Sequence, residues 1–327
     1  MVVGPKCRVR GGLSSAELDV TQLEYNDNKG PAGPCCVERW EGMRKAACID
    51  GTGVLASHLN FMGRDALNLV EFPLATLADR APKGCKTLVF EDRIRDRSRG
   101  ERVTRRLTIS GSDRYGLPTA LDDEVIVGLL QLTKADNFRS RRVRFNRYGL
   151  LRVLGWRDEG RSYARLEKSL QRWPGVTLYY ENAWWDKGRR QWLNVSFHLL
   201  DEVVLRGRSK PCGRAAGGDE NVAASYFTWN EIVFRSFQAG CLKQLDLDFY
   251  RSLKLPTSKR LYRFLDKRFH FSNQLDFDLG VLAREHVGLS RNYDAAQLRR
   301  RLTPAIEELE EAALCGRRRP CGAYELR

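Results

Sequence analysis

The sequence predicts an α+β protein that is mainly helical, with two tandem winged-helix domains, each built on a helix-turn-helix unit. Three observations favour this fold class. Apolar residues recur at helical spacing in two separate parts of the chain, and in each part a short glycine-containing turn joins two such helices. Two β-prone segments follow the first pair of helices, where a wing is expected. The length of 327 residues and the hydrophobic content of 42% suffice for about two packed domains.

Composition changes along the chain indicate the domain boundaries. Residues 1–60 hold seven basic and seven acidic side chains, whereas the whole chain has a formal charge of +15, so the excess lies downstream. Between Arg206 and Asn221, Gly, Pro and charged residues replace apolar periodicity. We therefore expect a mostly irregular extension over 1–66, a first winged-helix domain with a preceding β-hairpin over 67–205, a Gly-rich basic linker or loop over 206–221, a second winged-helix domain over 222–315, and a basic tail over 316–327.

The N-terminal extension has two interpretations. Met62 lies just before the periodic part of the chain, so our hypothesis is that the functional protein begins near Met62. Residues 1–61 would then be a disordered segment or an upstream reading-frame artefact, and their removal would leave folding and DNA binding nearly unchanged. The alternative is a small genuine addition to the fold, because the apolar content of this stretch is higher than is typical of disordered segments.

The first domain begins with a predicted hairpin and a helix. Two β-prone runs, Thr87–Asp92 and Arg102–Ile109, flank a charged turn. Thr119 and Asp122 then form a capping signal, after which apolar residues at helical spacing predict a helix with one buried face. The run Asp122-Asp123-Glu124 falls in the first turn of this helix, where negative charge complements the helix dipole and implies no catalysis.

A helix-turn-helix and a wing follow. The sequence predicts a helix over Asn146–Leu154 that ends at Gly155, and a second over Ser162–Arg172 that is stopped by Pro174. Strands over Val176–Asn182 and Trp192–His198 complete a winged helix, with basic and aromatic residues at the tip between them.

The second domain is predicted to repeat the unit. Helices are expected over Thr257–Phe269, Asp278–His286 and Asp294–Ala313, the last with a basic beginning and an acidic end. Leu154-Gly155-Trp156 in the first unit corresponds to Val287-Gly288-Leu289 in the second, which makes a weak internal repeat.

The charge distribution indicates a polyanionic partner. The pI is about 9.6, and residues 139–172 hold eleven basic and three acidic side chains. With about 100° per helical residue, Arg161, Arg165, Lys168 and Arg172 fall within about 60° of one another, opposite an apolar face. A surface helix usually carries charges of both signs, so a face of one sign favours contact with double-stranded DNA.

Candidate DNA-binding residues lie in both units. In the first turn of a recognition helix, Arg161, Ser162 and Arg165 are expected to read bases, while the other α5 cations and the wing cations hold phosphates. Whether Arg300 and Arg301 of the second unit read bases or hold the backbone stays open. The full set is Arg161, Ser162, Arg165, Lys168, Arg172, Lys187, Arg189, Arg190, Lys259, Arg260, Arg263, Arg291, Asn292, Gln297, Arg300 and Arg301.

Several other classes of site and compartment receive no support from the sequence. Nine cysteines without Cys-x-x-Cys spacing predict neither a disulfide framework nor a zinc site, so we expect no metal and a cytoplasmic location. Gly51-Thr52-Gly53 is followed by Ala56 where a dinucleotide loop has its third glycine, so no cofactor is expected. The longest apolar run, Val125–Leu130, is far shorter than the roughly 20 residues of a membrane span.

Several stretches resemble the plasmid replication initiator protein A family, over roughly residues 68–314. The resemblance implies sequence-specific binding at a replication origin, often to repeated sites, and recruitment of host helicase or initiator proteins. The stretches that carry it are Glu71-Phe72-Pro73-Leu74, Tyr115-Gly116-Leu117-Pro118-Thr119, residues 147–156, Gly160-Arg161-Ser162-Tyr163, Ser236-Phe237-Gln238-Ala239-Gly240 and residues 260–267.

Two alternatives to a non-enzymatic initiator remain open at this point. A winged-helix transcriptional regulator would use the same fold without a helicase contact. A DNA-nicking initiator would need divalent metal and a pair of nearby histidines, whereas His58, His198, His270 and His286 are dispersed. No phosphate-binding Gly-x-x-x-x-Gly-Lys-Ser/Thr loop occurs, which disfavours ATP hydrolysis. The sequence also leaves open whether the protein acts as a monomer or a homodimer.

Overall fold

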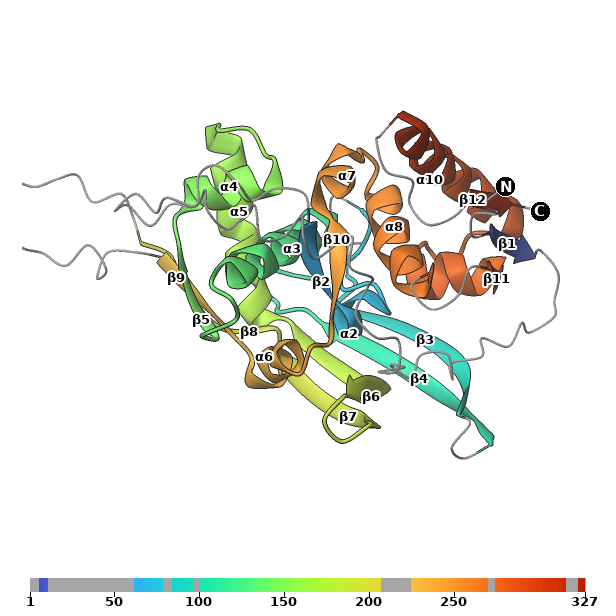
Figure 1. The fold of residues 1–327 in the computed structure, drawn as a ribbon, viewed down its shortest axis with the longest axis horizontal. Helices are drawn as coiled ribbons and strands as arrows, with labels where there is room; N and C mark the ends of the chain where they lie inside the picture. The colour runs from blue at the N-terminus through green and yellow to red at the C-terminus, as the bar shows by residue number, and fades with distance from the viewer. Residues whose placement is uncertain are drawn as a thin grey trace, which may run out of the picture.

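The computed structural model is a mixed fold of helices and sheets, so the expectation of a mainly helical protein is corrected (Figure 1). None of the described helices is long and apolar enough to cross a membrane. The segments that the structure describes are residues 6–10, 62–78, 84–96, 100–206, 225–269, 274–315 and 323–326.

A four-stranded antiparallel sheet contains both predicted hairpins. Its strand order is β3-β4-β6-β7, so the early hairpin lies beside the hairpin that follows the helices. Alternate residues such as Leu107, Ile109 and Leu178 are buried on one face of this sheet, as expected for a half-buried antiparallel sheet. Its strands are β3 (Thr87–Asp96), β4 (Glu101–Ser110), β6 (Thr177–Asp186) and β7 (Gln191–His198).

The three helices of the first unit form where their caps predict them. The N-cap Thr119 and Asp122 make the reciprocal capping box of α3. The side chain of Asn146 caps α4, and Gly155 ends it in the left-handed conformation, with φ of 70°. A short 3₁₀ turn, Trp173–Gly175, follows α5. The helices are α3 (Ala120–Ala135), α4 (Arg147–Leu154) and α5 (Gly160–Arg172).

A second antiparallel sheet, with strand order β5-β9-β8, was not expected. The strand β5 (Arg142–Phe145) precedes α4, β8 (Leu200–Val204) follows β7, and β9 (Ser225–Trp229) comes after residues 207–224, most of the predicted linker, which lie outside the described part. Phe227, Trp229 and the next helix, α6 (Glu231–Gln238), pack in the same core as α3 and α5. The predicted second domain, 222–315, is therefore divided between two cores.

The remaining helices form a second core. A short antiparallel pair joins β10 (Leu242–Asp246) to β2 (Met62–Ala66), and α2 (Leu67–Val70) follows β2. The three predicted helices of this unit are confirmed within a few residues, and its first helix-turn-helix member ends in a π-helical turn at the left-handed Gly288. These elements are α7 (Leu247–Ser252), α8 (Pro256–Phe269), β11 (Gln274–Asp278), α9 (Leu279–Val281), the π-helical turn Leu282–Val287 and α10 (Ala295–Cys315).

The second unit has no wing in the described residues. After α10 they contain only β12 (Ala323–Leu326), which pairs in parallel with β1 (Lys6–Arg10), and β1 also pairs with β11. Within the segment 1–66, which the sequence predicts to be mostly irregular, residues 6–10 and 62–66 are strands. Residues 11–61, with Gly51 and Ala56, lie outside the described part, as do 316–322.

Candidate nucleic-acid interface

An exposed cationic face lies on α5, the second helix of the first helix-turn-helix. Arg161, Arg165 and Lys168 are exposed, and within the described residues none of the three pairs with a carboxylate. On the opposite face Leu166 and Leu170 are buried in the core of the first unit. Packing of one face against α3 and α4 therefore turns the cations outward, as the helical spacing predicts.

Two of the five α5 residues chosen from the sequence do not join this face. Ser162 is 4% exposed and faces the core, so it cannot reach a base edge. Arg172, in the last turn, donates to the carbonyl of Tyr115 at 2.9 Å and forms an ion pair with Asp122 of α3. Its guanidinium is occupied by these partners, which leaves Arg161, Arg165 and Lys168 as the exposed cations of this face, here called the α5 cation face.

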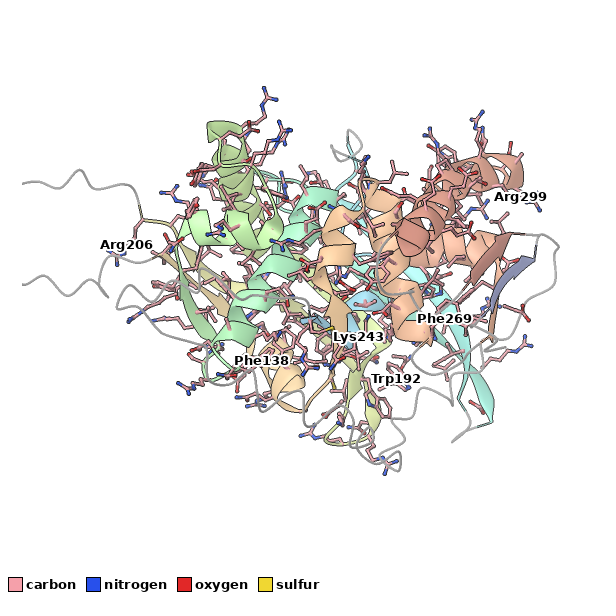
Figure 2. All side chains as sticks on the ribbon, turned by 45° about the horizontal axis from the view of Figure 1, so that its top comes forward. Phe138, Trp192, Arg206, Lys243, Phe269 and Arg299 are labelled. Atoms are coloured by element: carbon pink, nitrogen blue, oxygen red, sulfur yellow. The ribbon has the colours of Figure 1, made fainter. Side chains whose placement is uncertain are left out.

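The tip of the β6–β7 hairpin exposes Arg189 and Arg190, but it does not lie beside the α5 cation face. Both views place α4 and α5 at one edge of the molecule and the hairpin tip, next to Trp192, at the opposite edge (Figures 1 and 2). Lys187 is half-buried, with its Nζ close to Gly240 at the end of α6. The predicted wing cations are therefore a separate, smaller group.

Aromatic packing fixes the part of this hairpin next to its tip. Trp184 is buried against Tyr180 and Phe197, and Trp185 packs on Trp192 with ring centroids 5.1 Å apart. The amide side chain of Asn68 bonds both backbone groups of Trp185. Trp184 and Trp185 thus pack within the sheet, and Asn68 holds the backbone of Trp185.

The cationic stripe of α8 is buried, so its prediction as a DNA-facing surface is wrong. Arg263 is 2% exposed and binds Asp65 and Asp123, at 2.7 Å to each. Arg260 donates to the carbonyls of His286 and Glu71, and Lys259 pairs with Glu124 at 2.8 Å. The carboxylates and carbonyls that satisfy these side chains come from segments distant in sequence, and for that reason the stripe can face inward.

At the beginning of α10, hydrogen bonds within the protein engage some of the candidate residues. Arg291 binds Glu285 at 2.8 Å and the carbonyl of Val89, with 55% of its side chain exposed. Gln297 forms a reciprocal cap with Asp294 at the start of the helix. Asn292, Arg300 and Arg301 are exposed, the last over the ring of Tyr293 at 5.8 Å. Figure 2 places the neighbouring Arg299 at the far side of the molecule from α5.

The acidic run at the start of α3 connects three elements. Asp122 pairs with Arg172 of α5, Asp123 with Arg263 of α8, and Glu124 with Lys259 of α8. Asp122 also completes the predicted capping box. The non-catalytic interpretation of this run agrees with these contacts, because cations neutralise all three carboxylates.

Glu71 is the centre of a buried charge network between the two cores. Its carboxylate binds Arg105, at 2.8 Å, together with Lys267 and Arg268. Burial alone would raise the pKa of Glu71, but Arg268, Lys267 and Arg105 hold that pKa well below its usual range. Arg105 also forms a forked pair with Asp92, with its Nε 2.9 Å from Oδ1.

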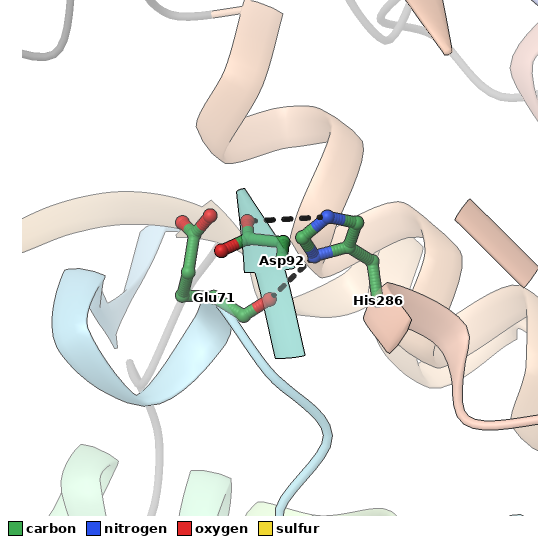
Figure 3. A group of neighbouring side chains, drawn as sticks. All are labelled: Glu71, Asp92 and His286. Atoms are coloured by element: carbon green, nitrogen blue, oxygen red, sulfur yellow. Dashed lines mark hydrogen bonds and ion pairs between the residues drawn. The ribbon is translucent and has the colours of Figure 1, made fainter. Parts of the chain in front are cut away.

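His286 lies next to this network (Figure 3). Its Nδ1 is 3.1 Å from the carbonyl of Glu71, and its Nε2 is 3.6 Å from Oδ2 of Asp92. The ring stacks against Phe264, with centroids 4.4 Å apart. Burial lowers the pKa of His286 to about 4, and the carboxylates of Asp92 and Glu71 offset this only in part. The imidazole is therefore neutral at pH 7.

Glu71, Asp92 and His286 are close enough to be metal ligands in principle, but their surroundings do not suit a cation. Three cationic side chains occupy the Glu71 carboxylate, and the carboxylate of Asp92 is bound by Arg105. A divalent ion would add charge where cations already outnumber carboxylates. We therefore interpret the group as part of the packing between α8 and the sheet.

Sequence reasoning missed this network and the elements between residues 225 and 252. For the elements between residues 225 and 252, two local signals were present. The aromatic and β-branched run Ser225–Trp229 is typical of a strand, and Asn230 and Asp246 are the caps of α6 and α7. No local signal marked Glu71 as buried.

Comparison with known proteins places the chain in a family. The sequence profile of the family "Replication initiator protein A" matches residues 64–309, about three quarters of the chain. Two solved structures of domains 2 and 3 of RctB are similar at 14% and 15% identity, with TM-scores of 0.47 and 0.40; each alignment covers 75% of this chain, and 84% and 82% of the RctB chains. No curated protein shows significant sequence similarity. The profile match spans both cores, from β2 to α10, and on this basis the chain belongs to the replication initiator protein A family.

Proposed function

We propose that this replication initiator binds double-stranded DNA at a plasmid origin, often at repeated sites, through the α5 cation face. The observation that carries the proposal is the exposure of Arg161, Arg165 and Lys168 on one helix without a carboxylate partner in the described residues. Elsewhere in the basic segment 139–172, carboxylates pair with Arg141, Arg142 and Arg147. The α5 cations are thus free of carboxylate partners in the part of the chain that the structure describes and remain available for phosphates and base edges.

Sequence recognition is proposed to lie in the first turns of α5. Arg161 and Arg165 stand on consecutive turns after the α4–α5 turn, which is where a recognition helix approaches the major groove. An arginine at this position can form two hydrogen bonds with the O6 and N7 atoms of guanine. Lys168, one turn further, has the compact charge suited to a phosphate.

Affinity for duplex DNA is expected to fall steeply with salt, with a slope of about −0.9 per neutralised phosphate in a plot of log affinity against log salt. Replacing Arg161, Arg165 and Lys168 together by Ala should flatten that slope by about 1 for each of them that holds a phosphate, Lys168 among them. The measurement is a salt series by fluorescence anisotropy. The control is Arg235→Ala on α6, which removes one cation that is paired with Glu231. An unchanged slope in the triple variant would contradict the proposal.

Arg165→Ala alone is expected to relax preference at one base pair, with a loss of about 1–3 kcal/mol of discrimination there. The measurement is binding to a site selected from a randomised duplex library, compared with each single-base substitution of that site. If affinity falls equally for the selected and shuffled duplexes, Arg165 contacts the backbone and does not read a base.

The hairpin tip is expected to be dispensable on short DNA. Because Arg189 and Arg190 lie at the opposite edge from α5, replacing both by Ala should leave affinity and salt slope unchanged on a duplex of about 15 base pairs. On a duplex long enough to bend around the protein, the same variant should flatten the slope by up to about 2. A flattening of about 2 already on the short duplex would place the tip beside the α5 cation face.

The biological proposal is that DNA binding by this chain starts plasmid replication without catalysis, by recruiting the host helicase or initiator proteins. Family membership supports a role in replication initiation. The test is whether the gene, together with an adjacent segment that contains repeated sequences, maintains a plasmid that lacks its own origin. A variant lacking the α5 cations should fail to maintain it, whereas Arg235→Ala should succeed.

A further inference from the structure

The turn between α4 and α5 is joined to the second core at two points. One contact is made by Arg251 of α7 and the other by Lys259 of α8. We propose that Arg251 and Lys259 are positioning residues that fix the orientation of α5 for base recognition. The inference rests on the proposed function, because it assumes that α5 is the helix that reads DNA.

The first contact is at the C-terminal end of α4. The guanidinium of Arg251 donates a hydrogen bond from Nη2 to the carbonyl of Arg152, 99 residues away in sequence. The backbone N–H of Gly155 donates to the same carbonyl at 3.1 Å. A cation at this end of a helix complements the helix dipole as well as satisfying a terminal carbonyl. Arg251 therefore acts as a cap that the second core supplies to α4.

Gly155 shows how closely Arg251 is fitted to the turn. The glycine has φ of 70°, and a Cβ atom added there would lie 3.3 Å from Nε of Arg251. A left-handed residue is needed to end α4, and the absence of a side chain leaves room for the guanidinium. The local chain direction after α4 is thus set against a residue of α7.

The second contact passes through a shared carboxylate. Glu124 of α3 accepts a hydrogen bond from Nε1 of Trp156 at 3.3 Å and binds Nζ of Lys259 at 2.8 Å. Trp156 directly follows Gly155 in the turn, and its ring packs against the first core. Lys259 also lies over the ring of Tyr250, 5.5 Å from its centroid. The turn, α3 and α8 are held together by one nearly buried ion pair.

The beginning of α5 depends on these contacts more than its end does. Leu166 and Leu170 anchor the later turns in the core, whereas in the first turn only the small Ser162 is buried and the N-cap Glu159 makes no side-chain capping hydrogen bond. Residues of the first turn therefore take their position from the preceding turn. Base recognition needs an arginine placed within a few tenths of an ångström, while phosphate attraction tolerates a shift. Loss of either contact should damage sequence discrimination before it damages non-specific binding.

The test compares Arg251→Ala and Lys259→Ala with the unaltered protein. The probes are a duplex of about 30 base pairs selected from a randomised library and a shuffled duplex of the same composition. In each variant, the ratio of the affinity for the selected duplex to that for the shuffled duplex is expected to fall at least about tenfold. The salt slope on shuffled DNA should change by less than about 0.5. Backbone amides of residues 156–163 should exchange hydrogen faster, while amides in the two cores stay protected.

Three further variants control the interpretation. Asp248→Ala removes the ion pair between Asp248 and Arg251 but leaves the contact with Arg152, so it should keep full discrimination. Lys259→Arg should restore discrimination, because the pair with Glu124 can re-form. If Lys259→Ala is poorly folded, Glu124→Gln, which keeps the shape of the side chain and weakens both bonds, should show the same loss.

Two results would overturn the proposal. One is unchanged discrimination together with unchanged exchange at residues 156–163. The other is a salt slope flattened by about 1 on both duplexes, which would make Arg251 or Lys259 a direct phosphate contact. Failure of the proposed function looks different, because the unaltered protein would then show no preference for any selected duplex, and the exchange measurement would still report whether the second core holds the turn.

Discussion

Glu71→Gln is expected to lower the free energy of unfolding by about 3–5 kcal/mol, the cost of removing one partner from a buried ion pair. The carboxylate of Glu71 binds Arg105, Lys267 and Arg268, all nearly inaccessible to solvent. The neutral amide can accept hydrogen bonds but leaves Lys267 and Arg268 without a compensating charge, while Arg105 keeps only its pair with Asp92. Urea denaturation followed by circular dichroism measures the change.

The matched control for this substitution is Glu91→Gln on β3. Glu91 also pairs with an arginine, Arg106 at 3.1 Å, but both side chains are about two-fifths exposed, so its loss should cost no more than about 1 kcal/mol. If the two variants are equally stable, the network contributes no more than a surface pair. If Glu71→Gln does not fold at all, Glu71→Asp, which keeps the charge, should recover part of the stability.

Stability is also expected to fall by about 2 kcal/mol between pH 7 and pH 5 because of His286. The pKa of His286 is about 4 in the folded protein, against an ordinary value of 6.5, so the unfolded chain binds more protons across this window. Unfolding therefore becomes more favourable as the pH falls from about 6.5 towards 4, and the stabilisation is complete only above about pH 6.5. Denaturation curves at pH 7, 6 and 5 measure the effect.

His286→Gln isolates this contribution. The glutamine has no titrating group, so the variant should be less stable at pH 7 but nearly independent of pH between 7 and 5. The carboxylates that face the histidine, Asp92 and Glu71, are both paired with cations, and the lowered pKa of Glu71 keeps that carboxylate ionised in this range. A variant with the same pH dependence as the unaltered protein would show that another group is responsible.

The sequence predicted best those elements whose signals are local. The capping box at Thr119, the left-handed Gly155 and the stop at Pro174 located α3, α4 and α5 within a few residues. The early hairpin was also found, but not its partners, because strand pairing depends on residues far apart in sequence. β5 and β9 are such a pair, separated by about 80 residues.

The residues of the candidate site also divide into those that local signals place correctly and those whose position depends on distant residues. On α5, Leu166 and Leu170 identify the buried face, so the exposed position of Arg161 and Arg165 follows from spacing alone. On α8, cations also recur at helical spacing, but they face the protein interior instead of the solvent. Arg263 faces inward because Asp65, 198 residues earlier, neutralises it. A helical pattern indicates which residues share a face of the helix. It does not indicate whether a carboxylate from a distant part of the sequence neutralises that face.

The distance along the chain between the partners of Glu71 has a consequence for the order of folding. Arg105 follows Glu71 by 34 residues, but Arg268 follows it by 197. During synthesis, the segment from β2 to Glu71 leaves the ribosome long before α8 exists, and its acidic side chains stay hydrated until then. Contacts of such high sequence separation form late and slow the final step of folding. A fragment that stops before residue 256 should therefore lack the tertiary rigidity of the whole chain, even though it contains every residue of the α5 cation face.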